Sequence, residues 1–352
     1  MDFNFNEQDY QQLFGEEFEK QQKDFEKIKQ SKLIFTLVGT VNCGKSSTIN
    51  ALMNRELSEA NATPGWTKDM KLFKLNDNVI IADTPGLQDI NEDVSKRTEE
   101  FIEKDTDIIL FFLNAAVGLT NPEKKAIETF KRLNRSLIIV LNKIDIWYDD
   151  GEFNEEAYHQ TINYIKAETG IDPIAISSKK KIHIELLHSK IMELAKKSGK
   201  DLLYAKVSRY KEEIVKKWIV RATTSAATVA AVPIPGSDIV PLTAIQVGLA
   251  MKIAYIYDCQ VNKADIMQLI ASTIMGSFSK QAYKAAITAM KGLGWLGGPI
   301  LEGAVMAVAA TIAATTTYAF GWSCNFYYKN GMSIDLGDLG VFYQQTYDEY
   351  KK

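Results

Sequence analysis

Between residues 39 and 46 the sequence reads Gly-Thr-Val-Asn-Cys-Gly-Lys-Ser, which has the spacing Gly-x-x-x-x-Gly-Lys-Ser. The run before it, Leu33–Val38, is apolar and rich in residues that favour strands, and the run after it, Ser47–Met53, can open a helix. A strand, a glycine loop and a helix in this order let backbone N–H groups close around a phosphate chain. This segment therefore predicts an α/β fold with a phosphate-binding loop.

The side chains of this loop have separate predicted roles. Lys45 is expected to lie against the β- and γ-phosphates of a nucleotide, and Ser46 is expected to bind Mg²⁺. An accidental Gly/Lys/Ser loop is the alternative interpretation, and the motifs that follow argue against it. The loop residues expected around the nucleotide are Gly39, Asn42, Cys43, Gly44, Lys45, Ser46 and Ser47.

A second motif, Asp83-Thr84-Pro85-Gly86, follows the apolar run Val79–Ala82. An acidic residue at such a strand end holds Mg²⁺ through water, so Asp83 is a predicted metal-site residue. The N–H of Gly86 is expected to meet the γ-phosphate of the nucleotide. An ordinary Asp-x-Pro-Gly turn is the alternative for this motif alone.

Two further motifs predict the base. Asn142-Lys143-Ile144-Asp145 follows the run Leu137–Leu141, and a carboxylate there can accept two hydrogen bonds from guanine N1 and N2, whereas adenine would leave it unpaired. Ser177-Ser178-Lys179 follows Pro173–Ile176, and its backbone N–H is expected to bind guanine O6. Each motif alone is matched by ordinary polar loops. All four at the carboxyl ends of strands indicate a guanine nucleotide at that edge of the sheet.

This set of motifs resembles the TrmE/Era-like GTPases of the translation-factor-related class over about residues 32 to 197. The group's switch pattern Pro-Gly-x-Thr stands here as Pro64-Gly65-Trp66-Thr67, so the resemblance makes Thr67 the switch-one ligand of Mg²⁺, with Thr63 as a nearby competitor. The group also uses a loop asparagine to bind potassium, and Asn42 occupies that place. The alternative is that Asn42 only shapes the loop.

Hydrolysis is expected to be slow at the basal level. Leu87 follows Gly86, and leucine cannot orient an attacking water as a glutamine does. In the resembled family, dimerisation of the nucleotide domains and potassium supply the missing help. The residues predicted to act in GTP hydrolysis are Lys45, Thr67, Gly86 and Asn42.

Composition limits the rest of the chain. Its 352 residues are too many for one ordinary core, which predicts at least two domains, and a net charge of −3 argues against nucleic acid as a main partner. The cysteines, Cys43, Cys259 and Cys324, have no metal-ligand spacing, which fits a reducing cytoplasm. The acidic, glutamine-rich start does not have the pattern of a signal peptide.

The texture of the sequence predicts three parts: an amphipathic N-terminal helix in 1–31, a GTPase domain in 32–197 and an all-helical domain in 198–352. The N-terminal helix is expected to pack on a helical domain. The GTPase domain is expected to have six strands, mostly parallel, with one antiparallel pair joined by Asn76-Asp77-Asn78. The predicted strands are Leu33–Val38, Met70–Leu75, Val79–Ala82, Ile108–Leu113, Leu137–Leu141 and Pro173–Ile176.

The sequence of the helical domain does not decide whether it binds or enters a membrane. One basic amphipathic helix is predicted through Leu203, Val207, Tyr210, Ile214 and Trp218, and its basic face suits either water or an anionic membrane. The uncharged stretch Gly303–Tyr328 is long enough to cross a bilayer but is rich in Ala, Gly and Thr, so both a soluble or conditionally membrane-associated bundle and a membrane hairpin remain possible. The other predicted helices are Ile239–Tyr257, Ala264–Met290, Ile300–Tyr328 and Leu339–Tyr350.

The segment 231–242, Ala-Val-Pro-Ile-Pro-Gly-Ser-Asp-Ile-Val-Pro-Leu, resembles the signature of the YcjF-type domain, which is attached to bacterial Era-like GTPases. The architecture also resembles immunity-related GTPases. These resemblances imply a GTP-hydrolysing switch with Mg²⁺ and potassium, a homodimer or oligomer through the GTPase domains, and a helical domain that binds membrane or self-assembles. Such a protein would be cytoplasmic or would lie at the inner membrane, peripherally or integrally. The alternative is a cytosolic, GTP-dependent protein-interaction or assembly module with little turnover.

Overall fold

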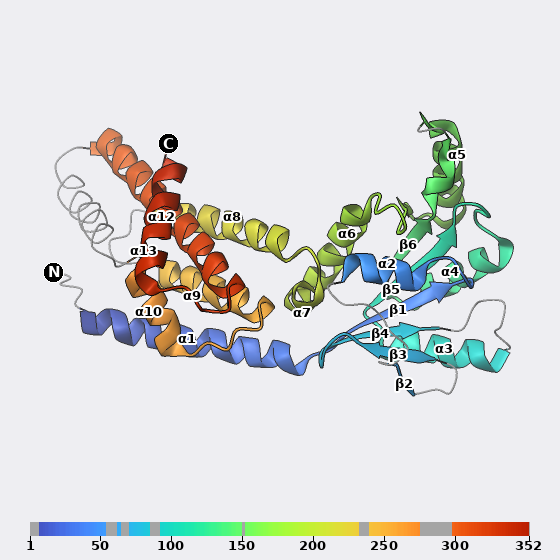
Figure 1. Cartoon of the computed structure of the whole chain (residues 1–352), viewed down its shortest axis with the longest axis horizontal. Coiled ribbons are helices and arrows are strands. Elements are labelled where there is room, and N and C mark those ends of the chain that lie inside the picture. Colours follow the sequence, from blue (N-terminus) through green and yellow to red (C-terminus); the bar gives the residue numbers. More distant parts are fainter. Residues whose placement is uncertain are drawn as a thin grey trace. The chain divides into compact units, whose positions relative to one another are not determined.

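The computed structural model of the chain describes residues 7–53, 62–64, 70–84, 92–149, 152–231, 239–274 and 298–351. They fall into two compact units, which we call the sheet unit (Ile28–Tyr210) and the helical unit (Met1–Lys27 with Lys211–Lys352). Every strand drawn in Figure 1 belongs to the sheet unit. The helical unit thus combines the two ends of the chain, whereas the sheet unit is continuous in sequence.

The sheet of the sheet unit has the order β2-β3-β4-β1-β5-β6-β9 in the described residues. Strands β4, β1, β5, β6 and β9 run parallel to one another. Because β1 lies between β4 and β5, the strand order reverses at β1, and open α/β sheets bind ligands beside such a point, at the carboxyl ends of the strands. The strands are β1 (Leu33–Gly39), β2 (Ala62–Pro64), β3 (Lys71–Lys74), β4 (Val79–Asp83), β5 (Ile108–Asn114), β6 (Ser136–Asn142) and β9 (Ile174–Ile176).

Helices pack on both faces of this sheet. Side chains of a strand alternate between its faces, and Val38 of β1 belongs to a buried cluster with Ile127 and Ile165 from two helices. Phe35 points to the opposite face and packs against Tyr204, with ring centroids 6.0 Å apart. The helices are α2 (Lys45–Leu52), α3 (Glu92–Asp105), α4 (Asn121–Arg132), α5 (Glu155–Thr169), α6 (Ile184–Lys197) and α7 (Asp201–Val207), with a 3-10 turn, η2 (Ile144–Trp147), and a short hairpin, β7 (Tyr148–Asp149) with β8 (Glu152–Phe153).

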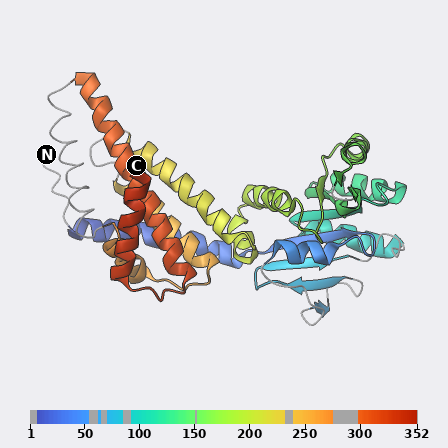
Figure 2. The ribbon, with the colours of Figure 1, turned by 45° about the horizontal axis from the view of Figure 1, so that its top comes forward.

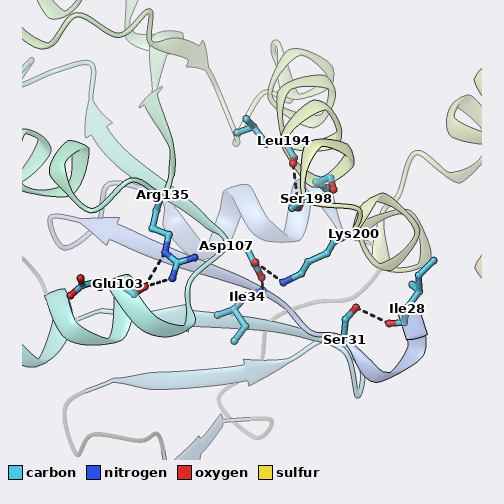
Figure 3. Close-up of polar contacts among 10 residues, drawn as sticks. Ile28, Ser31, Ile34, Glu103, Asp107, Arg135, Leu194, Ser198 and Lys200 are labelled. Atoms are coloured by element: carbon cyan, nitrogen blue, oxygen red, sulfur yellow. Dashed lines mark hydrogen bonds and ion pairs between the residues drawn. The ribbon is translucent and has the colours of Figure 1, made fainter. Parts of the chain in front are cut away.

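At the amino ends of the parallel strands, Asp107 joins three segments (Figure 3). Its carboxylate accepts hydrogen bonds from the backbone N–H of Ile34, at 2.9 Å, and from Lys200 Nζ, at 2.5 Å. Nearby, the Arg135 guanidinium donates to the carbonyl of Glu103. These bonds fix the start of β1 and the turn between α6 and α7 at the amino edge of the sheet, which is opposite the glycine loop.

The helical unit contains two long helices that pack antiparallel, α8 (Lys211–Ala230) and α12 (Gly298–Lys329), which lie side by side in Figures 1 and 2. A Cβ on Gly321 would lie 2.8 Å from the Ile219 side chain, so glycine allows the close approach. Towards the other end of the contact, alanines from the two helices share one buried cluster, namely Ala226, Ala230, Ala309 and Ala313. We call this contact the α8–α12 seam. It shows that the small residues of both helices serve to bring their backbones together.

Two buried hydroxyl groups lie within the α8–α12 seam. Thr223 is one helical turn beyond Ile219, and Thr317 is one turn before Gly321, so antiparallel packing places them at about the same level. Their side chains are 5% and 0% exposed. Neither Oγ1 has a hydrogen-bond partner among the described residues.

The first helix, α1 (Glu7–Gln30), packs on the helical unit, as its amphipathic pattern predicts. Phe25 lies edge-on to Tyr255 of α9 (Ile239–Ile256), with ring centroids 6.1 Å apart. Gly248 of α9 faces the side chain of Gln21. The unit also contains α10 (Lys263–Ser272) and α13 (Leu336–Lys351).

The predicted fold class is confirmed, with an N-terminal helix, a mostly parallel sheet and a helical C-terminal part. The prediction of six strands with one antiparallel pair was incomplete. A seventh strand, β2, pairs antiparallel with β3, and β3 pairs antiparallel with β4. Because β2 has only three residues, it has too little alternation to be recognised in the sequence.

Two helix predictions were wrong. The helix predicted through Leu203 and Trp218 is interrupted at Ser208, whose ψ of 146° is extended and whose backbone pairs with Met53. The helix predicted for Ala264–Met290 ends at Ser272, where hydroxyl groups of Ser272 and Thr273 bond to the carbonyl of Leu269. Residues 275–290 of that prediction lie outside the described residues. No helix in the described ranges combines the length and apolar character that crossing a bilayer requires.

Candidate nucleotide-binding site

The glycine loop between β1 and α2 has a backbone that its glycines make possible. Gly44 has φ 92°, and a Cβ there would lie 2.1 Å from the Asn142 amide nitrogen. Gly39 approaches the Phe112 carbonyl so closely that a Cβ would lie 2.7 Å from its oxygen. Asn42 also has a left-handed φ, 62°, which asparagine tolerates better than most residues. The loop is thus shaped by residues that can take conformations closed to ordinary side chains.

Lys45 bonds to the backbone of this loop. Its Nζ donates to the carbonyl oxygens of Gly39, at 3.2 Å, and Thr40, at 3.5 Å, and lies 3.7 Å from Oδ1 of Asp83. A lysine that bonds loop carbonyls at this position is placed to exchange them for phosphate oxygens. The predicted pairing of the loop with the end of β4 is therefore present in space.

Asp83 ends β4 beside β1, in register with Leu37. Its Oδ1 is buried and accepts no hydrogen bond from the described residues, because Lys45 is too distant for one. Burial raises the pKa of the Asp83 carboxyl above its ordinary value near 3.8, and the charges of Lys45 and Lys71 oppose this rise. A buried carboxylate oxygen that has an ion pair with Lys45 but no hydrogen bond from the described residues is the kind of group that a bound cation would satisfy.

Asn142, at the end of β6, ties three loops together. Its amide nitrogen donates to the Cys43 carbonyl, at 2.8 Å, and to Ser178 Oγ, at 3.2 Å. Its amide oxygen accepts from the N–H groups of Lys143, at 2.8 Å, and Ser178, at 3.1 Å. The side chain is completely buried, so this network fixes the glycine loop against the two loops predicted to hold the base.

Asp145 lies in η2, and its position is set by Ser177. The Ser177 hydroxyl donates to Asp145 Oδ1 at 2.6 Å and accepts the N–H of Lys180 at 3.1 Å. Ser177 also forms a backbone bridge with Ile182, which closes the loop after β9. The predicted base-recognition carboxylate is therefore held by the second predicted base loop.

The structure brings together the predicted residues of four strand ends, but two lie outside the described residues. These two residues are Thr67 and Gly86, so the structure does not test their predicted roles. Cys43 is buried, and burial raises the pKa of its thiol. Lys143 takes a left-handed φ of 70°. The side chains of Asn42, Ser46, Ser47 and Lys179 are exposed.

Sequence reasoning missed what several polar side chains do inside the site. Asn142 was grouped with the guanine contacts, whereas the structure uses its side chain to join loops. Thr84 is buried, and its hydroxyl donates to the Leu37 carbonyl at 3.0 Å, while Thr48 donates to the Gly44 carbonyl at 2.9 Å. The sequence does place a polar residue next to a motif residue in each case, which indicates a role in the site. The hydrogen-bond partner of that residue could not be identified without the fold.

Comparison with known proteins agrees with this geometry. Residues 34–143 match the family described as 50S ribosome-binding GTPase. The matched residues run from β1 through the glycine loop to the end of β6. The sheet unit carries a GTPase domain of this family. Residues 193–352 match a domain of unknown function, DUF697. The resemblance drawn from the motifs, a TrmE/Era-like GTPase followed by a YcjF-type helical domain, is confirmed.

The curated relatives match mainly the GTPase domain. The tRNA modification GTPase MnmE of Desulforamulus reducens is 28% identical over 200 residues, which are 54% of this chain and 41% of that protein. GTPase Der of Clostridium kluyveri is 28% identical over 48% of this chain and 38% of its own length. GTPase Era of a Thermoanaerobacter species is 29% identical over 53% and 62%, respectively. The chain thus spans less than two thirds of the length of each of these relatives.

Proposed function

We propose that this protein is a GTP-binding and GTP-hydrolysing switch whose nucleotide state controls its helical unit. The observation that carries the proposal is the hydrogen-bond network of Asn142, which joins the glycine loop to both predicted base loops. A nucleotide has to meet phosphate-binding and base-binding groups at the same time. A buried side chain that fixes these loops in one arrangement preorganises the edge for such a ligand.

Guanine selectivity is assigned to Asp145. Ser177 fixes its carboxylate, and each carboxylate oxygen has two lone pairs, so Oδ1 can accept from Ser177 and from a base together. The N1–H and N2–H groups of guanine match a pair of carboxylate acceptors. Adenine offers no such pair and would leave a desolvated carboxylate unpaired. Ser178 and Lys179 complete the predicted base site.

The residues present fit a magnesium ion. Asp83 Oδ1 is a buried oxygen without a hydrogen-bond partner in the described part of the chain, and Ser46 presents a hydroxyl in the first turn of α2. Carboxylate and hydroxyl oxygens are the ligands that Mg²⁺ prefers. When bound, Mg²⁺ neutralises charge on the β- and γ-phosphates. Asp83 and Ser46 would hold it, and Thr67 is the further ligand that the switch pattern predicts.

Hydrolysis is proposed to be slow without help from a second copy or a cation. Lys45 stabilises charge on the transferring phosphoryl group, and Gly86 contributes an N–H in the GTP state, but Leu87 has no group that orients water. Asn42 stands at the exposed turn of the glycine loop, where a potassium ion could reach the phosphates. Its left-handed backbone also supports the simpler role of shaping that loop.

Association of two GTPase domains through the carboxyl edge is supported by exposed apolar side chains. Val41 of the glycine loop is 66% exposed, and Val117, in the loop after β5, is 65% exposed. Ile146 and Tyr148, which follow Asp145, are also exposed. Apolar groups on the loops around one site are a feature of surfaces that associate. We therefore propose a homodimer or oligomer formed at the nucleotide edge.

The helical unit is proposed to act in membrane association or self-assembly at the cytoplasmic side of the inner membrane. Its α8–α12 seam buries two threonine hydroxyls that have no partner within the described ranges, which makes this packing less favourable than an apolar seam of the same shape. Such helices could exchange packing on one another for packing on lipid or on a second copy. The alternative is a cytosolic, GTP-dependent interaction module in which turnover is minimal.

Nucleotide selectivity is the first test. We expect wild-type protein to bind GTP at least 100-fold more tightly than ATP in a fluorescent-nucleotide competition assay, which corresponds to about 2.7 kcal/mol. Asp145→Asn should weaken GTP binding and favour xanthosine triphosphate, because the new amide NH2 opposes the N2–H donor of guanine but can donate to the 2-carbonyl of xanthine. Asp172→Asn changes a 71% exposed carboxylate paired with Lys166 and serves as the matched control. Equal binding of ATP and GTP by the wild type would refute the proposal.

Flotation with liposomes separates the two proposed roles of the helical unit. The full chain is mixed with anionic vesicles in the presence of GDP or a non-hydrolysable GTP analogue, and self-assembly is followed by light scattering without vesicles. A switch of the proposed kind should float or assemble more with the GTP analogue than with GDP. Nucleotide binding without either response supports the interaction module.

A further inference from the structure

The end of α2 is bonded to the segment Ser208–Tyr210, the last three residues of the sheet unit. The N–H of Arg209 donates to the Leu52 carbonyl at 3.0 Å, and its Nη2 donates to the Asn50 carbonyl at 3.1 Å. The backbone of Ser208 pairs with that of Met53 in an antiparallel bridge. Arg209 therefore caps the carboxyl end of α2, although it lies far away in the sequence.

Helix α2 connects the glycine loop with the Arg209 contact. It begins at Lys45, beside the glycine loop, and ends at Leu52, where Arg209 bonds its carbonyls. An eight-residue helix is marginal by itself, so its stability depends on the packing of its buried residues, Ile49 and Leu52 among them, and on what its ends contact. An anion at the amino end and a cation at the carboxyl end both stabilise the same helix dipole. A nucleotide phosphate and Arg209 thus act on the same short element from opposite ends.

The segment Ser208–Tyr210 is also held on its other side. Ser208 Oγ accepts the N–H of Tyr210 at 3.1 Å and lies 3.5 Å from His188 Nδ1. The His188 ring stacks on Tyr210, with centroids 4.3 Å apart, and on Tyr204, at 5.5 Å. Residue Lys211, which follows directly, begins α8. The backbone that leads into α8 is thus fixed between α2 and the α6–α7 pair.

We propose that the Arg209 cap couples occupancy of the phosphate site to the order of the segment that leads into α8. The inference rests on the proposed nucleotide-dependent function and names the element that would carry its signal. Coupling between two sites is reciprocal, so a phosphate that stabilises α2 strengthens the Arg209 contact, and loss of that contact weakens phosphate binding. Arg209→Ala keeps the backbone hydrogen bond from residue 209 to the Leu52 carbonyl. It removes only the contact of the guanidinium with the Asn50 carbonyl and its contribution to the coupling.

The experiment compares full-length wild type, Arg209→Ala, Arg209→Lys and the control Arg221→Ala, which removes an exposed arginine of α8. Affinity for Mg·GDP is measured by fluorescence, and hydrogen exchange of residues 207–214 is measured with and without saturating Mg·GDP. Arg209→Ala should bind GDP about two- to fivefold more weakly, as expected for a charge at an exposed helix end. Arg209→Lys keeps the charge and should retain most of the affinity. Melting curves establish that each variant is folded.

Exchange is the measurement that a merely structural arginine would not affect in this way. In the wild type and in Arg221→Ala, GDP should slow exchange of residues 207–214, and in Arg209→Ala at least half of that slowing should be lost at saturating GDP. An unchanged response in Arg209→Ala, or no response in a wild type that binds GDP, would overturn this inference alone. A full chain that binds no guanine nucleotide would overturn the proposed function and this inference with it.

Discussion

The carboxyl edge of the sheet and the α8–α12 seam both bury polar side chains, but they satisfy them differently. At the sheet edge, the buried amide of Asn142 uses its nitrogen and its oxygen in four hydrogen bonds to three loops. In the seam, the hydroxyls of Thr223 and Thr317 are buried without a partner in the described part of the chain. The same kind of group is therefore stabilising in one place and costly in the other.

The difference indicates which region is fixed and which can rearrange. A fully paired polar network specifies a single arrangement, because breaking any member leaves a buried group unsatisfied. Unpaired hydroxyls lower the stability of the packing that contains them, so another arrangement that pairs them costs less. Among the described residues of the sheet edge, Asp83 Oδ1 is a comparable atom, because it has an ion pair with Lys45 but no hydrogen bond, and its surroundings fit a bound cation. We infer that the edge is preorganised for its ligand, whereas the seam can rearrange at a lower cost than a fully paired contact.

The largest effect is expected from Gly44→Ala, which breaks the paired network at its centre. The new Cβ would meet the Asn142 amide nitrogen, and the residue would keep a left-handed φ of 92°. Strain of this kind costs about 1–3 kcal/mol before any clash is counted, so we expect at least a 100-fold loss of Mg·GDP affinity by fluorescence titration. Gly199→Ala has a similar φ of 69° but open space around its Cβ, and it should leave affinity unchanged. Equal affinities of the two variants would contradict the network.

A smaller effect is expected at Asp83, whose Oδ1 has no hydrogen-bond partner in the described part of the sheet edge. The folded state raises the pKa of its carboxyl, so folding favours the protonated form and the ionised group destabilises the nucleotide-free protein at neutral pH. Asp83→Asn should therefore raise the melting temperature without nucleotide, while it weakens Mg²⁺-dependent GTP binding about 10- to 100-fold. Lys45 keeps its bonds to the Gly39 and Thr40 carbonyls in this variant.

Asp107→Asn is the matched control, because that carboxylate of the same unit is fully engaged by Ile34 and Lys200 (Figure 3). It should lower the melting temperature and leave Mg²⁺ dependence intact. Melting curves of nucleotide-free protein and titrations with and without EDTA measure both outcomes. A decrease in stability for both variants would mean that Asp83 is paired in the protein in solution.

The fold was largely predictable because its signals are local. Apolar runs such as Leu137–Leu141 are followed directly by motif residues, and each predicted strand of the sheet is present. One error arose where a distant contact overrides a local pattern. The helical spacing continues from Val207 to Ile214, yet the backbone breaks at Ser208, because that residue pairs with Met53.

The site was predictable as a set of motifs but not as a network. The spacing of the glycine loop and of Asn142-Lys143-Ile144-Asp145 located the strand ends. The role of the Asn142 side chain depends on Cys43, which is 99 residues away in the sequence, and on Ser178, 36 residues away. Such pairings follow from the order of the parallel strands, which the motifs alone do not specify. The cap of α2 by Arg209 is of the same kind.

The seam is tested by converting its hydroxyls to methyl groups. Thr223→Val and Thr317→Val keep the side-chain shape and remove a buried unpaired group, so each should stabilise the helical unit by about 1 kcal/mol. Thr315→Val in the same helix is the control, because Thr315 is equally buried but donates to the Thr311 carbonyl at 2.8 Å, and it should be neutral or destabilising. Chemical denaturation with helical-unit exchange as the readout measures the difference. A loss of stability in Thr223→Val would remove the contrast between the two regions.

The smallest effect is expected at Asn42, an exposed polar side chain of the sheet edge. Its left-handed φ of 62° can be explained by backbone preference alone, or its side chain can bind potassium, and two substitutions separate these roles. Asn42→Gly keeps the backbone conformation without a side chain, whereas Asn42→Ala disturbs both. Single-turnover GTP hydrolysis is compared in matched potassium and sodium chloride.

If the Asn42 side chain binds potassium, the wild type should hydrolyse GTP about threefold faster or more in potassium than in sodium, which is equivalent to about 0.65 kcal/mol of barrier. Asn42→Gly should then lose this ratio at unchanged nucleotide affinity. A ratio preserved in Asn42→Gly, with affinity lost only in Asn42→Ala, would assign Asn42 to the shape of the loop, and the edge would then act through its paired network without a monovalent ion.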